Sequence, residues 1–220
     1  HDVWEETAGA VDVSFSPLYD MWGFGFKNGS MPSSAQVDSV MNLCGMGLCL
    51  ESIDDLIGKE VAPESIYLAP HASAHPQLNY NAIAQGYSCD LVARYLYSIG
   101  VKDMMVDIGE IYCDGVNPSG RPWTIGIDRP VDGNDRPGAD VQEIFHVPDG
   151  PHGVVTSGNY RKFYVRDGKK YAHTIDPRTG YPVTHSLLSA TIIAENAMLA
   201  DAYATYFMVI GLERSKDFLS

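Results

Sequence analysis

The chain has 220 residues, of which 45% are hydrophobic and 20% are charged. At about 150 residues per domain this length fits one large domain or two small ones, and the composition excludes a disordered, collagen-like or coiled-coil chain. The 15 basic and 28 acidic residues give a net charge of −13, which argues against a nucleic-acid or anionic-membrane surface. No apolar run reaches the roughly 18 residues that a transmembrane helix needs.

The N-terminal third of the chain predicts short elements. Glycines beside large aromatic residues between Thr7 and Phe26 indicate a packed, irregular connection. Ser33 or Ser34 is placed to cap a short helix that runs towards Asn42. Strand-like runs follow at residues 49–53 and 66–68.

The clearest helix signal begins after Asn81, which we expect to cap it. Apolar residues then recur every four positions, and Gly100 follows as a stop signal. The spacing predicts an amphipathic helix whose apolar stripe contains Ile83, Tyr87, Leu91 and Tyr95.

The second half of the chain alternates strand signals with turns. Strands are expected at residues 104–108, 111–113, 123–127, 144–147 and 188–194, and Asp167-Gly168 predicts a hairpin between residues 161–166 and 169–175. Asn196 opens a helix to about Ile210, and a second helix is expected from about Ser215. This pattern predicts an α+β fold with largely antiparallel sheets, in a single domain over residues 1–220.

The four cysteines favour buried thiols over a zinc site, because none forms a CxxC pair or stands close to a histidine. A disulfide between Cys44 and Cys49 remains an open alternative. The other two cysteines are Cys89 and Cys113.

A carboxylate and a hydroxyl stand one turn apart on the last long helix. Asp201 and Thr205 are four residues apart, so they share a helix face and form half of a site for a hard cation such as Mg²⁺. The alternative is a surface aspartate beside a threonine that bonds to its own helix. The apolar neighbours indicate partial burial, and a buried carboxylate needs a partner.

Two further polar segments are candidates for chemistry. His173 lies just before Asp176-Pro177-Arg178-Thr179-Gly180 and is a candidate general base, although a strand histidine is more often structural. Thr156-Ser157-Gly158-Asn159-Tyr160 follows an apolar strand. Its backbone amides are able to hold a phosphate, but the same residues also make a plain turn.

Taken together and in this order, these segments resemble one family, the FAD:protein FMN transferases or ApbE family. The resemblance extends over nearly the whole chain, and its specificity comes from several weak motifs in register. The matching segments are Gly9-Ala10-Val11-Asp12, Pro17-Leu18, Trp22-Gly23-Phe24-Gly25, Asn81 to Tyr87 with Asp90, Ile108-Gly109, Pro122-Trp123, Gly126-Ile127, Pro130, Thr156 to Tyr160, His173, Ile175 to Gly180, and Ala200-Asp201-Ala202 with Thr205.

The resemblance implies Mg²⁺-dependent cleavage of the FAD pyrophosphate, transfer of FMN to a threonine or serine hydroxyl of an acceptor flavoprotein, and release of AMP. It implies that Asp201, Thr205 and the backbone carbonyl of Ala82 bind the metal, and that His173 is the base on the acceptor hydroxyl. The cofactor-binding residues that it implies are Ala10, Val11, Asp12, Asn79, Gln85 and Ile175, with Thr156, Ser157 and Gly158 lining the site.

This chain departs from the family pattern at several positions. Asn79 replaces a common Asp, Gln85 a common Lys or Glu, Val11 a common Phe, and Glu110 a common Gly. The chain also lacks the segment that precedes Gly9 in family members, so we expect it to be part of a longer protein. The resemblance implies a bacterial periplasmic location, or the outer face of a membrane, through a lipid anchor that this chain does not contain.

Two alternative functions remain open from the sequence. One is an FAD pyrophosphatase, which would use water in place of a hydroxyl and give FMN and AMP. The other is a non-catalytic FAD-binding protein, which the Asn79 and Gln85 departures allow.

Overall fold

The computed structural model describes residues 1–24, 31–46, 77–131, 133–134, 136–160, 163–166 and 168–220. These residues form two compact units, which are described separately. The first unit comprises His1–Asn79 and Ile175–Tyr181, and the second comprises Tyr80–Thr174 and Pro182–Ser220. The strands expected at 49–53 and 66–68 lie outside the described residues, and the single domain over residues 1–220 stays a prediction.

The first unit contains α1 (Asp2–Glu6), α2 (Ser16–Met21) and α3 (Ser34–Met41). The irregular connection expected before Phe26 is wrong in part, because α2 lies within it; Pro17 stands in the first turn, where a proline is tolerated. The cap of α3 is confirmed. The Ser33 hydroxyl accepts the Gln36 amide, and the Gln36 side chain accepts the Ser33 amide at 2.9 Å, which together form a capping box.

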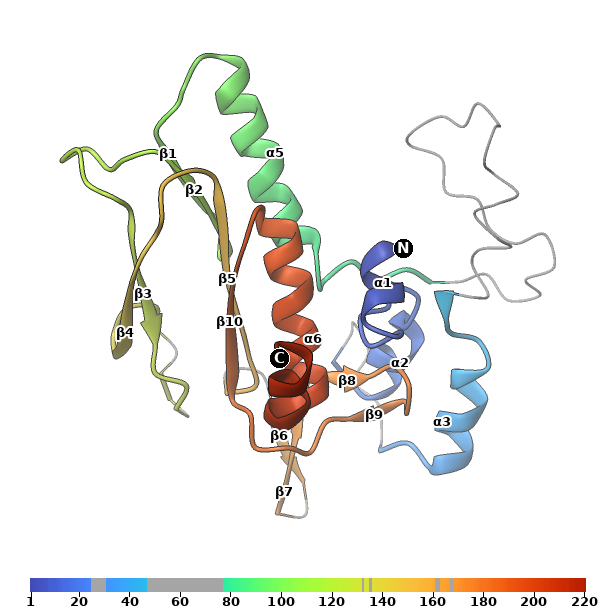
Figure 1. Ribbon diagram of the computed structural model, residues 1–220. Coiled ribbons are helices and arrows are strands. Elements are labelled where there is room, and N and C mark those ends of the chain that lie inside the picture. The colour runs from blue at the N-terminus through green and yellow to red at the C-terminus, as the bar shows by residue number, and fades with distance from the viewer. Residues whose placement is uncertain (25–30, 47–76, 132, 135, 161–162, 167) are drawn as a thin grey trace, which may run out of the picture. The chain divides into compact units, whose positions relative to one another are not determined.

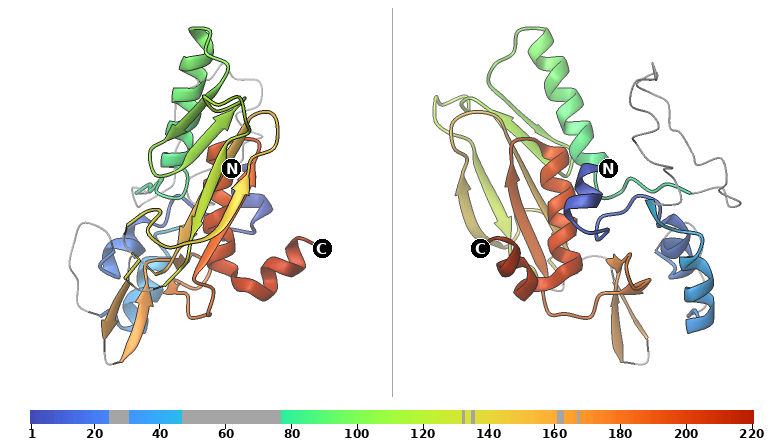
Figure 2. Two further views of the ribbon diagram at one scale, coloured as in Figure 1. Left: turned by 90° about the vertical axis from the view of Figure 1, so that its left-hand side faces the viewer. Right: turned by 45° about the vertical axis from the view of Figure 1, so that its right-hand side comes forward.

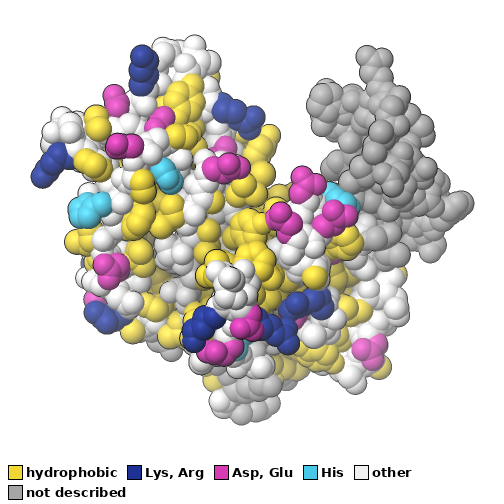
Figure 3. Space-filling model, viewed as in Figure 1, with side chains coloured by type: hydrophobic (Ala, Val, Ile, Leu, Met, Phe, Trp, Pro, Cys, Tyr) yellow, Lys and Arg dark blue, Asp and Glu magenta, His cyan; other side chains and the backbone are white. Residues whose placement is uncertain are grey.

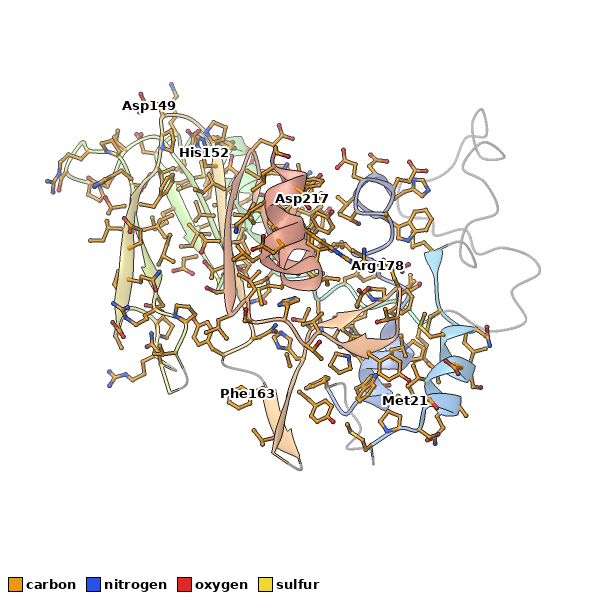
Figure 4. The ribbon with its side chains drawn as sticks, turned by 60° about the horizontal axis from the view of Figure 1, so that its bottom comes forward. Met21, Asp149, His152, Phe163, Arg178 and Asp217 are labelled. Atoms are coloured by element: carbon orange, nitrogen blue, oxygen red, sulfur yellow. The ribbon has the colours of Figure 1, made fainter. Side chains whose placement is uncertain are left out.

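A tight turn at residues 175–181 belongs to the first unit. The indole N–H of Trp22 donates to the carbonyl of Gly180 at 2.8 Å. Gly180 has a φ of +78°, and a Cβ there would lie 2.8 Å from Val37 Cγ1. The guanidinium of Arg178 (Figure 4) binds both carboxylate oxygens of Asp176, at 2.9 and 2.8 Å, and so closes the turn.

A four-stranded antiparallel sheet organises the second unit, in the order β1-β2-β5-β10. The described residues also form the two-stranded pairs β3-β4 and β6-β7 in this unit, and the short pair β8-β9 at the 175–181 turn. The pairing confirms the expected antiparallel α+β fold and the hairpin around Gly168. The strands are β1 (Met104–Asp107), β2 (Ile111–Asp114), β3 (Thr124–Asp128), β4 (Val141–His146), β5 (His152–Gly158), β6 (Phe163–Arg166), β7 (Lys169–Ala172), β8 (Ile175–Asp176), β9 (Tyr181–Pro182) and β10 (Ser189–Ala194).

The four-stranded sheet is covered on both faces. The helices α5 (Ala84–Ser98) and α6 (Ala197–Phe218) lie along one face, and the β3-β4 pair lies along the other (Figure 1). On β5, Val155 packs against Ala200 and Ala204 of α6. The preceding Val154 packs in the opposite cluster with Ile125 of β3. Successive strand residues point to opposite faces, so β5 contributes to both layers of the core.

The buried face of α5 is not the stripe that the apolar spacing marked. Tyr87, Leu91 and Tyr95 are 43%, 46% and 64% exposed, and hydrophobic side chains are visible at the surface in this part of the molecule (Figure 3). The buried residues are instead Gly86, Cys89 and Ala93. Small residues allow the helix backbone to approach the sheet and α6 closely, so residue size selects the packed face here.

The helix α6 is bent at Gly211. This residue has φ +77° and ψ 173°, which no helix accommodates, and the segment after it turns away from the first part (Figure 2). His185 lies against the bend, and its Nε2 is 2.9 Å from the Met208 carbonyl, which the break leaves without a helical partner. The expected helix end near Ile210 is confirmed, but the next helix follows the bend directly and does not wait until Ser215.

The two helices of the second unit cap each other. The expected cap at Asn81 is wrong, because α5 begins at Ala84 and its N-cap residue makes no side-chain hydrogen bond. The carboxylate of Asp201, on α6, accepts the amide of Gly86 in the first turn of α5 at 3.1 Å. In return, Asp90 of α5 accepts the first two amides of α6, at 2.8 and 2.9 Å. Asn196 caps α6 as expected.

Buried thiols are confirmed at Cys89 and Cys113, and burial raises the pKa of each to about 11. Cys44 is also buried, whereas Cys49 lies outside the described residues. None of the helices in the described ranges is long and apolar enough to cross a membrane.

The approach of β5 to α6 yields the first prediction. A Cβ at Gly153 would collide with the backbone of Asn196 and Ala197, which cannot move aside. We expect Gly153→Ala to lower the free energy of unfolding by about 2–3 kcal/mol. Gly126→Ala is the control: it places a Cβ 3.3 Å from the Val141 side chain and should change stability by less than about 0.5 kcal/mol. Equal losses in chemical denaturation would contradict this packing.

The cap from α5 to α6 yields the second prediction. Asp90→Ala removes the acceptors of two helix amides and should cost about 1–2 kcal/mol of unfolding free energy. Glu213→Ala, which removes an exposed carboxylate paired with Lys216 on the same helix, should cost less than about 0.5 kcal/mol. Urea denaturation of both variants measures the difference, and an Asp90 variant as stable as the parent would refute the cap.

Candidate functional site

Asp201 is a charged side chain in a largely buried position. The residue is only 4% exposed, and the Gly86 amide donates to its Oδ2 at 3.1 Å. Burial raises the pKa of Asp201 to about 6, although the hydrogen bond from Gly86 lowers it in part. The burial inferred from its apolar neighbours is therefore confirmed, and the interpretation as a surface aspartate is wrong.

The chain enters α5 through a turn that contains Ala82. The carbonyl of Tyr80 accepts the amides of Ile83 and Ala84, at 2.9 and 2.8 Å. In a continuous helix the Gly86 amide would donate to the carbonyl of Ala82, four residues earlier. Here it donates to Asp201, so this carboxylate joins α6 to the turn in which the Ala82 carbonyl stands.

Gly86 is the residue that permits this approach. A Cβ at this position would collide with the carbonyl of Ala197 and would lie 2.9 Å from Asp201 Cβ. Thr205 stands one turn after Asp201 and is half-buried, so the predicted carboxylate and hydroxyl share one face of α6. Thr205, Asp201 and the Ala82 turn thus belong to one region of the second unit.

Two more carboxylates, those of Asp107 and Glu110, add negative charge near Asp201 from the end of β1 and the turn that follows it. Burial raises the pKa of Glu110 to about 7, and the negative charges of Asp201 and Asp107 raise it further in the same direction. No lysine or arginine among the described residues forms an ion pair with Glu110 or Asp201. A buried negative charge without a protein cation is costly, which fits a bound metal cation.

The donor set fits Mg²⁺ better than a metal with a full protein cage. In the described part of the chain, no group of three or more His, Cys, Asp or Glu side chains is arranged to hold a metal. Mg²⁺ commonly takes one or two carboxylates and completes its shell with water and substrate phosphates. Asp201, the Thr205 hydroxyl and a backbone carbonyl are oxygen donors of this kind.

Gln85 lies next to Gly86 in the first turn of α5. Its Nε2 donates to the carbonyl of Ile108 at 3.2 Å, in the turn that carries Glu110. The thiol of Cys89, one helical turn later, donates to the Glu110 carbonyl at 3.0 Å. The side chain predicted to bind cofactor therefore makes a contact within the protein.

The predicted segment at 156–158 ends β5 and pairs with β10. Thr156 Oγ1 lies 2.8 Å from Thr191 Oγ1 across the pair, while Ser157 and Gly158 face Ala190 and Ser189. After this segment, the backbone N–H of the buried Asn159 donates to the Leu188 carbonyl at 2.8 Å.

His173 follows the end of β7 and is half-buried. The next residue, Thr174, donates its hydroxyl to Asn159 Oδ1 at 2.6 Å, and its carbonyl accepts the Val183 amide at 3.0 Å. The structure therefore bonds the residue after His173 to the segment after β5, a connection that the sequence did not predict.

The first unit holds the remaining predicted cofactor residues. Ala10, Val11 and Ile175 are buried, with exposures of 1%, 5% and 2%. The Asp12 carboxylate accepts the Trp4 indole at 2.9 Å, the Ser14 amide and hydroxyl, and the Met46 amide at 3.1 Å. The backbone N–H of Asn79 donates to the carbonyl of Val13, next to Asp12, at 2.6 Å.

Sequence reasoning missed the roles of three residues in the second unit. Asp90 and Gly86 stand in matched motifs, but their contacts with α6 appear only in the fold. Glu110 was noted as a departure, and its position beside Asp201 depends on the pairing of β1 with β2. The signal that was available is Gly86 itself, because a glycine inside a helix costs stability relative to alanine and is therefore worth checking for a close packing contact.

The chain is similar to known proteins over nearly its whole length. The chain matches the model of the ApbE family over residues 1–220. It is 32% identical over 218 residues to the "FAD:protein FMN transferase" of Escherichia coli K12 and 36% identical over 213 residues to that of Vibrio cholerae. These matches cover 96% and 94% of the chain but only 57% and 58% of the two relatives.

Solved structures show the same fold. The apo form of the flavinyl transferase ApbE from Pseudomonas stutzeri has a TM-score of 0.79 and 33% identity, and the match covers 99% of this chain and 62% of the other. The ApbE protein of Thermotoga maritima also has a TM-score of 0.79, with 26% identity and coverage of 99% and 65%. The chain belongs to the ApbE family.

Proposed function

We propose that the protein transfers FMN from FAD to a threonine or serine hydroxyl of an acceptor flavoprotein and releases AMP, in a reaction that depends on Mg²⁺. The observation that carries this proposal is the buried carboxylate of Asp201, bonded to the opening turn of α5 in a chain that matches the ApbE family throughout. The named relatives are FAD:protein FMN transferases, and this chain spans 57% of the first of them.

Asp201, Thr205 and the carbonyl of Ala82 would hold the metal. The Gly86 amide keeps the carboxylate oriented, and the α5–α6 contact keeps the Ala82 turn close to it. When bound, Mg²⁺ would neutralise the charge that develops on the FAD pyrophosphate. Glu110 adds negative charge to this region, which favours a cation over a bare anionic substrate.

His173 would accept the proton of the acceptor hydroxyl. The hydroxyl oxygen forms a bond to the FMN phosphorus, the bond from that phosphorus to the AMP oxygen breaks, and the proton passes to the imidazole. The hydrogen bond between Thr174 and Asn159 restrains the residue beside His173 and would limit its movement during this step.

The FAD contacts that we infer are those that the family resemblance implies, namely Ala10, Val11, Asp12, Asn79, Ile175 and the 156–158 segment. A location in the bacterial periplasm, or on the outer face of a membrane through a lipid anchor, stays a prediction from the family resemblance.

The decisive test is AMP release from FAD by the protein with Mg²⁺, with and without a threonine-bearing acceptor peptide. AMP only with the peptide, together with an FMN mass on it, is the expected result. AMP without the peptide would make the protein an FAD pyrophosphatase. Bound FAD without AMP in either tube would make it a non-catalytic FAD-binding protein and refute the proposal.

The metal assignment predicts a specific loss of activity. Asp201→Asn keeps an oxygen that can accept the Gly86 amide but removes the negative charge, so the fold should persist. We expect AMP release to fall by at least about 100-fold, because a metal contributes several kcal/mol to the transition state. Asp149→Asn makes the same chemical change on the exposed loop between β4 and β5 (Figure 4) and should leave the rate unchanged. An active Asp201→Asn variant would exclude this ligand.

The raised pKa of Glu110 predicts a pH-dependent stability without metal. Its carboxyl has a pKa of about 7 in the fold and about 4.5 when unfolded, so the folded state binds more protons between these values. Stability therefore falls as the pH rises through this window. We expect Glu110→Gln to be more stable than the parent at pH 8, by about 1 kcal/mol after allowance for solvent screening, and equally stable at pH 4.5 or below.

Mg²⁺ should reduce that difference at pH 8 by stabilising the parent. Glu143→Gln on the exposed strand β4 serves as the control and should follow the parent at both pH values. Denaturant unfolding with and without Mg²⁺ measures all three proteins. If Glu110→Gln is no more stable than the parent at pH 8 without Mg²⁺, the negative charge of Glu110 is already compensated within the fold.

A further inference from the structure

Gln85 joins two segments that approach Asp201 from different directions. Its backbone stands in the first turn of α5, directly before the Gly86 amide that donates to Asp201. Its side chain crosses to the turn between β1 and β2, where Nε2 donates to the Ile108 carbonyl at 3.2 Å. One carboxamide thus connects the helix end to the turn that carries Glu110.

The receiving turn is built to accept this contact closely. Gly109 has a φ of +107°, which disfavours any residue with a side chain, and its amide donates to the Asp107 carboxylate at 3.0 Å. A Cβ at Gly109 would lie 2.9 Å from Gln85 Nε2. Gly109 therefore leaves room for the carboxamide, and the two residues form a clamp, the Gln85–Gly109 clamp.

The consequence of the clamp lies one residue further on. Glu110 follows Gly109, and its carbonyl accepts the Cys89 thiol at 3.0 Å, one helical turn after the Gly86 amide that donates to Asp201. The charge of Asp201 is one cause of the raised pKa of Glu110. Without the Gln85 bond, the turn would keep its strand pairing and the Cys89 contact but would lose its side-chain bond to the first turn of α5, which would leave Glu110 less restrained.

We propose that Gln85 is a positioning residue for the metal site, and that it acts by clamping the β1–β2 turn so that Glu110 stays beside Asp201. The inference rests on the proposed function, because it requires Mg²⁺ to bind at Asp201. It differs from the role that the family resemblance implies for this position, which is direct contact with FAD. One N–H of this exposed carboxamide is bonded to the Ile108 carbonyl, so the side chain has a partner within the protein.

The test is Mg²⁺ binding by isothermal titration calorimetry to the purified protein and to Gln85→Met, which has similar length, no charge and no donor. Loss of one net hydrogen bond that orders the site should weaken Mg²⁺ binding by about 3- to 10-fold. Ser88→Ala, which removes a side-chain bond to Ala84 within the same helix, is the control and should bind Mg²⁺ as the parent does.

A double-mutant cycle separates the clamp from a general loss of stability. If Gly109→Ala weakens Mg²⁺ binding through the same contact, the double variant Gln85→Met/Gly109→Ala should bind no more weakly than Gly109→Ala alone. FAD binding without Mg²⁺ should be the same in Gln85→Met and the parent. Unfolding temperatures without metal show whether each variant is folded. If Gly109→Ala does not fold, the Mg²⁺ affinity of Gln85→Met alone tests the clamp.

Unchanged Mg²⁺ affinity in Gln85→Met would overturn the inference, and so would weaker FAD binding without metal, which would assign Gln85 to the FAD site. If the parent itself binds no Mg²⁺, the proposed function fails and the inference fails with it. A parent that binds Mg²⁺ and loses binding in Asp201→Asn, while Gln85→Met binds normally, would refute the clamp and leave the proposed function in place.

Discussion

The exchange of carboxylate caps between α5 and α6 is the interaction on which the second unit depends. Helix N-termini leave amides without partners, and here each helix supplies an aspartate to the other. Asp90 takes two amides of α6, and Asp201 takes one amide of α5. Gly86, Ala93 and Ala197 keep the interface thin enough for these short side chains to reach across. Packing and capping therefore support each other.

The same exchange gives the site its chemistry. A capping carboxylate normally stands in solvent, but Asp201 is buried and shares its surroundings with Glu110, so two acidic groups are held close at an energetic cost. The fold accepts that cost because the capping bond and the β1–β2 turn hold both groups in place. A cation bound there would turn this repulsion into attraction, and phosphate oxygens of a substrate would complete its shell. The predicted instability without metal and the proposed affinity for metal would then have one cause.

Features that depend on neighbouring residues could be predicted from the sequence, and features that depend on distant contacts could not. The caps at Ser33 and Asn196 and the hairpin at Gly168 use short-range rules, and all three are confirmed. The start of α5 was misplaced because its cap comes from Asp201 rather than from Asn81. The buried face of α5 was not apparent from the sequence, because the size of the side chains, and not their hydrophobicity, determines which face packs against the sheet and α6. The pair Asp201 and Thr205 was found from helical spacing, whereas the position of Glu110 required the register of β1 and β2.

The bond between Asp201 and Gly86 joins residues 115 positions apart in the chain. Closing a loop of that length carries a large entropic cost, so contacts of this kind tend to form late, after local helices and hairpins. A nascent or partly folded chain would then lack the site altogether, and cations would find only scattered surface carboxylates. The metal would recognise an arrangement that exists only once folding is complete. Bound metal would therefore slow the unfolding of the native state and would not speed its folding.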